Sequence, residues 1–550
     1  MRVNVGCVAA LFTLHFLVVG ATESREFDFH VSNLQRNGVQ RTVVNGQYPG
    51  PLIRVPYGSH VRVNLFNDLD INHTSIHWHG IHQHGTPYSD GFPTQNQCPI
   101  PPKKSMKYNF NADPPGTALW HAHFHSMNAD GLYGPFVVED RPGSFPFLYD
   151  EERVILLTDE YGTTSWELED YVSTPDANGN PHLDPTPIGG LLCLYDESDE
   201  TSVTSSCSRG PSGDGFNLNF EPGKVYRLRI ICGSIIAPFI FSIDQHELQL
   251  VSSDFSPLDG NTWVKGVPIA TGQRYDVLVR TKATVQPGAA FWIRATLQPQ
   301  CWPPTGATFN PDVRGVLTYN HNPSKTIPIP KSNTWNVTNP TCDDISYSLL
   351  RPHPSSFFQP DAPSTEEPSV SLFLNYTFPI ADGPALHTLV NGQRYQVDDT
   401  AYPTLFAIQE NAVWTPPTSE QRNLMIIPDE YRGKTVRIVL IATGLGSHPF
   451  HMHGHGFQVV AIGVGSFDDA ALTQANSMDL HNAVVRDTVT IPAGGWVVIH
   501  VTADNPGVWA LHCHIGWHLK SGMLGQIVEL PQAISNEVHI PQTLKNLCGN

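Results

Sequence analysis

Charged residues are scarce in this 550-residue sequence, and bases are scarcer than acids. They make up 15% of the chain, with 32 Lys and Arg against 51 Asp and Glu, and the formal net charge is −19. Such a charge disfavours nucleic acid and anionic membrane surfaces as partners. Disorder is excluded too, because 40% hydrophobic and 10% aromatic residues are enough to bury a core.

Long apolar runs are also missing. The stretch 8–19 has twelve residues, fewer than the roughly 20 that span a bilayer, and no later stretch is longer and equally apolar. It follows Arg2 and ends at Val19-Gly20-Ala21, whose small residues suit cleavage after Ala21. We therefore expect residues 1–21 to be a secretion signal rather than an anchor, and the mature protein to be extracellular or in the cell wall.

Glycine and proline, in contrast, are plentiful, with 44 and 47 residues. This composition favours an all-β protein with many turns, and the length predicts two to four domains. Asn-X-Thr motifs that are candidate glycan acceptors begin at Asn72, Asn336 and Asn375.

Nine cysteines must be accounted for in an oxidising compartment. Cys7 lies in the expected signal, which leaves Cys98, Cys193, Cys207, Cys232, Cys301, Cys342, Cys513 and Cys548. Cys513 stands between two histidines, which suggests a role other than a disulfide. The remaining seven cannot all pair, and Cys232, in an apolar run, is the candidate for a buried free thiol.

Internal repeats predict the architecture. A glycine followed by an alternating apolar pattern occurs at 58–65, 223–230 and 433–440, and each predicts a half-buried strand. A second pattern ends in His121-Ala122-His123 and in His512-Cys513-His514, and its weaker middle copy ends in Ile293-Arg294-Ala295. Three copies of one β-sandwich module explain both patterns, and only the outer copies carry histidines.

Composition also suggests where the modules end. We expect modules at 22–141, 142–326 and 369–550. Residues 327–368, rich in Pro, Ser and Thr, are expected to be a long connection.

Four histidine clusters carry the chemistry. Side chains at positions i and i+2 of a strand share a face, roughly 6.5–7 Å apart, so each pair can bind one metal or bridge two. Facing pairs from the outer modules would gather eight imidazoles: His77, His79, His121, His123, His451, His453, His512 and His514. Imidazole suits copper, zinc, iron or nickel, so this cluster alone does not name the metal.

Cys513 narrows the choice of metal. Strand alternation directs it away from His512 and His514, toward a separate site that His448 and His518 can join, with Met523 nearby. Two imidazoles, a thiolate and a weak thioether are typical of an electron-transfer copper site. A structural zinc site is the alternative, although it normally has four strong ligands. For Met523 alone, core packing is the alternative.

With these motifs the sequence resembles the multicopper oxidases, and among them fungal laccases and ascorbate oxidases, over essentially the whole mature chain. The resemblance implies three cupredoxin-like Greek-key β-sandwich or barrel domains, the middle one without ligands, and four copper ions. His448, Cys513 and His518 would bind the type 1 copper, with Met523 axial. The other ligands would be His77 and His451 for type 2, and His79, His121, His514 and His123, His453, His512 for the type 3 pair.

The resemblance also implies disulfides Cys98–Cys548, Cys193–Cys207 and Cys301–Cys342. Many laccases have a further bridge to the position of Cys232, but its partner is missing here, which agrees with a free thiol.

The implied reaction takes electrons singly from an organic donor near His518 and passes them through Cys513 to the clustered coppers, where dioxygen becomes two waters. Asp90 matches the family carboxylate that supplies protons, although an aspartate before glycine also suits a plain turn. Gly516 stands where a second acid is frequent, so Asp90 is expected to carry more of that supply. Asp184 aligns with the carboxylate that accepts a phenolic proton, with an exposed turn acid as the alternative.

Met523, where many fungal laccases have Leu or Phe, predicts a low potential and easily oxidised donors such as phenols, catechols or ascorbate. Partners are expected to be a small reducing molecule and dioxygen, and the chain to be a monomer. An ascorbate oxidase or a ferroxidase would share every copper ligand. Non-catalytic wall relatives commonly lose copper ligands, and none is lost here. A copper store or carrier would bind metal without consuming oxygen.

Overall fold

The structure is a computed structural model. It describes residues 23–549 except 177–181, 183, 196–204, 287, 303–308, 323, 355–367, 381–386, 396–400, 412–422 and 445. The expected signal, residues 1–21, lies outside the described residues. Within the described part, no helix is both long and apolar enough to cross a bilayer.

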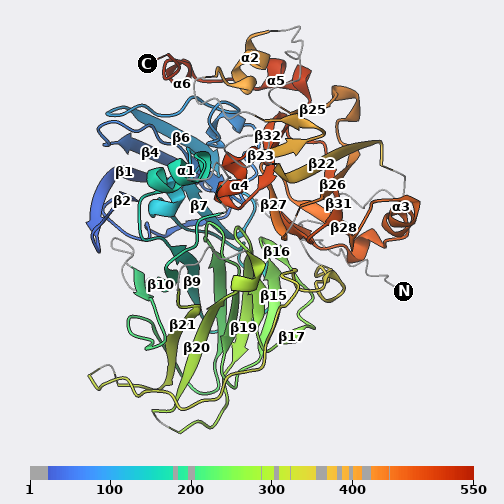
Figure 1. Cartoon of the computed structure of the whole chain (residues 1–550). Coiled ribbons are helices and arrows are strands. Elements are labelled where there is room, and N and C mark those ends of the chain that lie inside the picture. Colours follow the sequence, from blue (N-terminus) through green and yellow to red (C-terminus); the bar gives the residue numbers. More distant parts are fainter. Residues whose placement is uncertain are drawn as a thin grey trace, which may run out of the picture.

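The first unit (blue in Figure 1) consists of two four-stranded sheets, ordered β2-β1-β4-β6 and β3-β8-β7-β5. Its strands are β1 (Ser24–Arg36), β2 (Val39–Val44), β3 (Ile53–Pro56), β4 (His60–Asn67), β5 (Ile76–His79), β6 (Ser105–Asn111), β7 (Gly116–Ala122) and β8 (Tyr133–Glu139).

The middle unit (green to yellow in Figure 1) has an eight-stranded and a five-stranded sheet. The larger contains β9 (Glu151–Glu160), β10 (Gly189–Tyr195), β11 (Ser205–Ser208), β13 (Val225–Cys232), β15 (Leu248–Ser253), β16 (Ser256–Pro257), β17 (Trp263–Val264) and β19 (Arg274–Arg280). The smaller contains β12 (Asn217–Phe220), β14 (Phe239–Ile243), β18 (Val267–Ile269), β20 (Ala290–Leu297) and β21 (Asp312–Tyr319). Helix α1 (Ser165–Ser173) follows β9.

The third unit (orange to red) has a seven-stranded and a five-stranded sheet. The first contains β22 (Val370–Ile380), β23 (His387–Val390), β24 (Gln393–Arg394), β26 (Thr435–Ala442), β28 (Phe457–Val464), β29 (Val485–Arg486) and β31 (Gly495–Thr502). The second contains β25 (Leu424–Ile427), β27 (His448–Met452), β30 (Thr488–Ile491), β32 (Gly507–Cys513) and β33 (Leu524–Glu529). Its helices are α2 (Thr404–Glu410), α3 (Asp469–Asn476), α4 (Gly516–Lys520), α5 (Pro531–Glu537) and α6 (Gln542–Lys545).

One strand arrangement recurs in all three units, as the repeats predict. β4, β13 and β26 each pair in parallel with the first strand of their unit, β1, β9 or β22. Each begins two residues after a glycine of the repeat, and Gly58, Gly223 and Gly433 all have a positive φ of 73° to 82°, a turn conformation in which a side chain is strained. The all-β prediction is confirmed, whereas the module boundaries at 141 and 326 stay predictions.

The units share buried cores. One core includes Ile235 of the middle unit and Met523 of the third, and another includes Trp78 of the first and Val528 of the third. The first and third units lie side by side above the middle one, and β7, β27 and α4 face the junction (Figure 1). Side chains at this junction are therefore held by packing from all three units.

The expected connection 327–368 contacts the units along its described part. Asp344 accepts hydrogen bonds from the backbone N–H and hydroxyl of Thr490, at 2.9 and 2.6 Å, and from the Gln273 amide at 2.7 Å. Residues 327–354 are therefore anchored between the middle and third units, and 355–367 lie outside the described residues.

The three implied disulfides are present: Cys98–Cys548, Cys193–Cys207 and Cys301–Cys342. The first joins residues 450 positions apart and links the first unit to the end of the chain. Cys232 is a buried free thiol, as predicted, and burial raises its pKa to about 12, so it is an inert thiol.

Candidate metal centre

Four strands bring the eight histidines together. β5 pairs with β7 so that His77 lies opposite His121, and β27 pairs with β32 so that His451 lies opposite His512. The remaining histidines of the four motifs lie two positions along the chain, on the same face: His79, His123, His453 and His514. All eight are buried where the first and third units meet.

The ring nitrogens face one another at the spacing that a shared metal ion requires. The distances are 3.3 Å for His77 and His451, 3.2 Å for His79 and His514, 3.4 Å for His123 and His512, and 3.1 Å for His453 and His512. Two nitrogens each about 2.0 Å from one tetrahedral ion lie roughly 3.3 Å apart. Three compact sets result: His77, His79, His451; His79, His121, His514; and His123, His453, His512.

A second layer of oxygen atoms orients seven of the eight rings. The outward nitrogen of each of these rings lies 2.8–3.1 Å from one oxygen atom. The pairs are His77 with Asp90 O, His79 with Asp487 Oδ1, His121 with Ala122 O, His451 with Asp487 O, His453 with Asp90 Oδ2, His512 with Cys513 O and His514 with Thr271 Oγ1. A ring that donates outward keeps its inward lone pair for a metal. His121 Nε2 is such an inward atom, buried and without a hydrogen-bond partner among the described residues.

Burial favours the neutral form of seven of these rings. Burial, together with the neighbouring imidazoles, lowers the pKa of His121 to about 3. Burial is also the largest cause of the lowered pKa of His79, His123, His451, His453, His512 and His514. Neutral imidazole is the form that binds metal, so the cluster suits cations without prior loss of protons.

Cys513 lies on the other side of its strand, as alternation predicts. Its Sγ lies 3.4 Å from His518 Nδ1 and 3.9 Å from His448 Nδ1, and the two nitrogens are 3.2 Å apart. Met523 is fully buried, its backbone N–H donates to His518 O, and its carbonyl accepts from Cys513 N–H. Two imidazoles and a thiolate at these distances fit copper by their donor chemistry.

Both predicted carboxylates contact histidines of these sites. Asp90 is fully buried, with Oδ2 2.9 Å from His453 Nδ1 and Oδ1 3.3 Å from His77 Nδ1. Asp184 Oδ2 lies 2.9 Å from His518 Nε2, and these side chains are 15% and 6% exposed. Burial lowers the pKa of His518, but Asp184 and Cys513 raise it to about 10 in the metal-free protein.

Comparison with known proteins agrees with this geometry. Three family models described as multicopper oxidase match residues 29–143, 151–322 and 392–533. Laccase-1 of Cryptococcus neoformans var. neoformans serotype D is 32% identical over 97% of this chain and 85% of its own. The chain belongs to the multicopper oxidase family.

Two further relatives cover nearly all of this chain at lower identity. The iron transport multicopper oxidase FET3 of Gibberella zeae is 28% identical over 100% of this chain and 83% of its own. The crystal structure of the laccase from Botrytis aclada superposes with a TM-score of 0.78 at 28% identity, covering 97% and 92% of the two chains. This multicopper oxidase is therefore a copper oxidoreductase with three cupredoxin-like domains, of the kind that oxidises small-molecule donors with dioxygen.

Two charged residues next to the cluster were not predicted from the sequence. Arg274 of the middle unit and Asp487 of the third form a fully buried ion pair, Nη2 to Oδ2 at 2.5 Å. Asp487 Oδ1 also lies 3.1 Å from His79 Nε2, and Arg274 Nε donates to the carbonyl of Thr117 in the first unit. Burial alone would raise the pKa of Asp487, but Arg274 and His79 hold it well below its usual range.

Thr271 is the third unpredicted residue, three positions before Arg274. Its Oγ1 lies 3.0 Å from His514 Nδ1, so the middle unit, which supplies none of the eight rings, orients one of them. Neither Thr271 nor the Arg274–Asp487 pair lies in a histidine motif, and the pair is separated by 213 positions, so no local pattern indicates these contacts.

Replacing Arg274 with Met should lower the free energy of unfolding by about 3–5 kcal/mol, because Asp487 would stay buried without its cation. The double variant Arg274→Met/Asp487→Leu should recover most of that loss. Urea denaturation of the metal-free protein measures both. The control Arg432→Met breaks an ion pair with Glu537 whose side chains are 50% and 49% exposed, and should cost less than about 1 kcal/mol. Equal stability of the single and double variants would contradict the assignment.

Proposed function

We propose that this protein is a secreted, laccase-like oxidase of phenolic or related donors that holds four coppers. One copper would be held by His448, Cys513 and His518, with the thioether of Met523 as a weak further donor, and one by His77 and His451. The type 3 pair would be held by His79, His121, His514 and by His123, His453, His512. The observation that carries the proposal is Cys513, whose sulfur faces one candidate site while its two neighbours in sequence face the other.

Copper, when bound, supplies a one-electron acceptor at Cys513 and the oxygen-reducing centre among the imidazoles. The chain joins them through the shortest covalent route available, from Cys513 to His512 and His514. Separating the sites lets a donor that yields single electrons serve an acceptor that needs four electrons and four protons to form two waters.

Asp184 supports an organic donor with an ionisable O–H. Its carboxylate is partly exposed beside the Nε2 edge of His518, so it can accept the hydroxyl proton as the electron leaves through the imidazole. A ferroxidase is the second candidate, favoured by the same carboxylate, which would also bind ferrous iron, and by the likeness to FET3. An ascorbate oxidase shares the ligand set, and a non-catalytic copper-binding wall protein is the least supported alternative.

Oxygen-electrode traces with a diphenol, ascorbate and ferrous iron test the proposal on protein whose copper content has been measured. We expect about four coppers per chain, a blue colour, and the highest kcat/KM with the diphenol. Asp184→Asn should lower kcat/KM for the diphenol by about 10²-fold, the low end for a lost general base. It should not lower the rate with hexacyanoferrate(II), an anion that gives up no proton. Preference for ferrous iron would replace the proposal with the second candidate, and no oxygen uptake would refute both.

Asp90 is proposed to orient His453 through Oδ2 and to hold a proton on Oδ1 for oxygen reduction. Asp90→Asn keeps the shape of the side chain but not its basicity, so oxygen uptake should fall by about 10²-fold or more. The loss should grow toward alkaline pH, where solvent protons are scarce. The reduction rate of the blue copper by donor, measured without oxygen, is the control and should not change. Unaltered oxygen uptake across the pH range would rule out the relay.

Met523 is proposed to lower the potential of the blue copper through its thioether. Met523→Leu removes that weak donor and should raise the potential, because the thioether favours the oxidised ion. Redox titration of the blue absorption measures the change. Met425, whose methyl group lies near Gly525, offers a matched Met→Leu control. A potential that stays constant or falls in Met523→Leu would contradict a role of the thioether at this copper.

A further inference from the structure

His123 differs from the other seven rings of the cluster. Its Nε2 faces inward, 3.4 Å from His512 Nε2, but its outward Nδ1 is buried and has no hydrogen-bond partner among the described residues. His123 as a whole is only 6% exposed. Metal-binding histidines almost always donate their other N–H to an oxygen atom, and a buried donor left unpaired is costly. This ring therefore lacks the acceptor that each of the others has.

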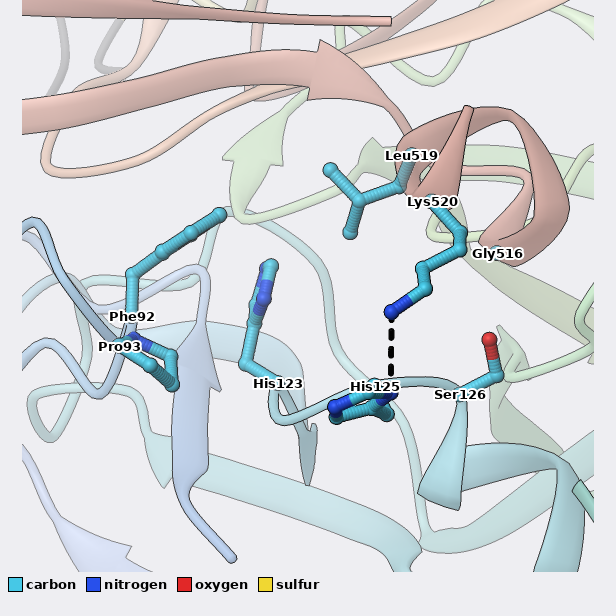
Figure 2. Close-up of a pocket in the computed structure, with 8 residues that line it drawn as sticks. All are labelled: Phe92, Pro93, His123, His125, Ser126, Gly516, Leu519 and Lys520. Carbon is cyan, nitrogen blue, oxygen red and sulfur yellow. Dashed lines mark hydrogen bonds between the residues drawn. The ribbon is translucent and has the colours of Figure 1, made fainter. Parts of the chain in front are cut away.

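A pocket lies against this ring (Figure 2). It has a cavity volume of about 30 Å³ and is lined by Phe92, Pro93, His123, His125, Ser126, Gly516, Leu519 and Lys520. One water molecule needs about 10–15 Å³ by the same measure, so the pocket holds the equivalent of two waters. It is open to solvent on one side, since Lys520 has 26% of its side chain exposed.

Lys520 adds a positive charge to the pocket wall. In Figure 2 the side chain of Lys520 reaches toward His125, and the His123 ring lies between Lys520 and Phe92. Lys520 Nζ lies 3.1 Å from His125 Nδ1, but that ring nitrogen lies 2.6 Å from Glu169 Oε2. A nitrogen that donates its hydrogen to a carboxylate cannot also accept one from an ammonium. The ammonium therefore keeps N–H groups for an acceptor in the pocket.

Glu169 is not the acceptor for the remaining N–H groups of Lys520. Its Oε2 lies 3.6 Å from Lys520 Nζ, beyond ordinary hydrogen-bond distance, and its Oε1 accepts from the backbone N–H of Ser126 at 2.5 Å. Glu169 and Lys520 balance each other in charge, so a metal ion on His123 would add positive charge at this wall of the pocket. Such an ion also makes the Nδ1–H a stronger donor.

Gly516 leaves the space beside these donors without a side chain. A Cβ built at this position would lie 3.0 Å from a methyl group of Ile235 and 3.9 Å from Ser126 Oγ, and the backbone there has an ordinary φ. A side chain would thus be accommodated with a small shift of Ile235. The pocket is open because residue 516 is glycine.

We propose that this pocket binds a small monovalent carboxylate of the size of formate. One carboxylate oxygen accepts from His123 Nδ1–H and the other from Lys520 Nζ, with the apolar edge of the ion against Phe92 and Leu519. Three heavy atoms match the volume of two waters, whereas sulfate, with five, is too large. The site adjoins the proposed set His123, His453, His512, because it shares the outward nitrogen of His123, and a carboxylate bound there would act on this side of the cluster.

Line broadening of ¹³C-labelled formate, titrated with the copper-loaded enzyme at ionic strength fixed with sodium sulfate, tests the proposal. We expect saturable broadening that unlabelled formate reverses. Lys520→Met should weaken binding by about tenfold or more, the usual effect of losing a hydrogen bond to a charged group. Gly516→Glu should abolish it, because the new carboxylate would occupy the pocket. Lys434→Met, at an exposed lysine beside the Tyr431 ring, is the matched control and should bind as the wild type does.

Absence of saturable broadening would show that water alone fills the pocket and would overturn the proposal. So would broadening that is equal in the wild type, Lys520→Met and Gly516→Glu, since formate would then bind directly to copper. If Gly516→Glu fails to fold, the comparison of Lys520→Met with the wild type still decides between these outcomes. The readout is independent of turnover, so failure of the proposed oxidase activity and failure of this site are distinguishable.

Discussion

The buried ion pair between Arg274 and Asp487 is the contact on which the metal centre depends most directly. It joins the middle unit to the third, and its two members also contact the first through Thr117 and His79. Removing two charges from water is expensive, and the pair is tolerable only because hydrogen bonds satisfy nearly every atom of both groups. The result is a fixed carboxylate that holds His79 in one orientation. The same aspartate also accepts from His451 through its backbone carbonyl, so it orients two of the eight rings.

The middle unit therefore takes part in the metal centre although it contributes none of the eight rings. Besides Arg274, it brings Thr271 to His514 and places Gly272 against the face of that ring. A Cβ at Gly272 would lie 2.8 Å from His514 Cδ2, and its φ of +81° favours glycine independently. The middle copy of the repeat therefore lacks the histidines but still orients and packs against one of the rings.

The sequence allowed prediction of those parts of the centre that follow from local periodicity. Alternation along a strand was enough to group His512 with His514 and to send Cys513 to the opposite face, because the period of two is a property of the backbone. The disulfides followed from family resemblance. Arg274 and Asp487 could not be found in this way, because their partnership depends on how separate sheets pack. The segment 327–354, predicted as a plain connection, is anchored by Asp344 for the same kind of reason: its partners Thr490 and Gln273 are distant in sequence.

The disulfide between Cys98 and Cys548 has a consequence for how long metal stays bound. The histidines come from two units that are held against each other by packing, by hydrogen bonds such as that from Leu405 N–H to Gln95 O, and by this covalent link. If packing between them opened briefly, the tether would keep the two half-sites at a high effective concentration, so closure would compete well with escape of an ion. Retention of the metal would then be a kinetic property of a tethered pair rather than of affinity alone. A reducing environment would shorten the residence time of the metal without altering a single ligand.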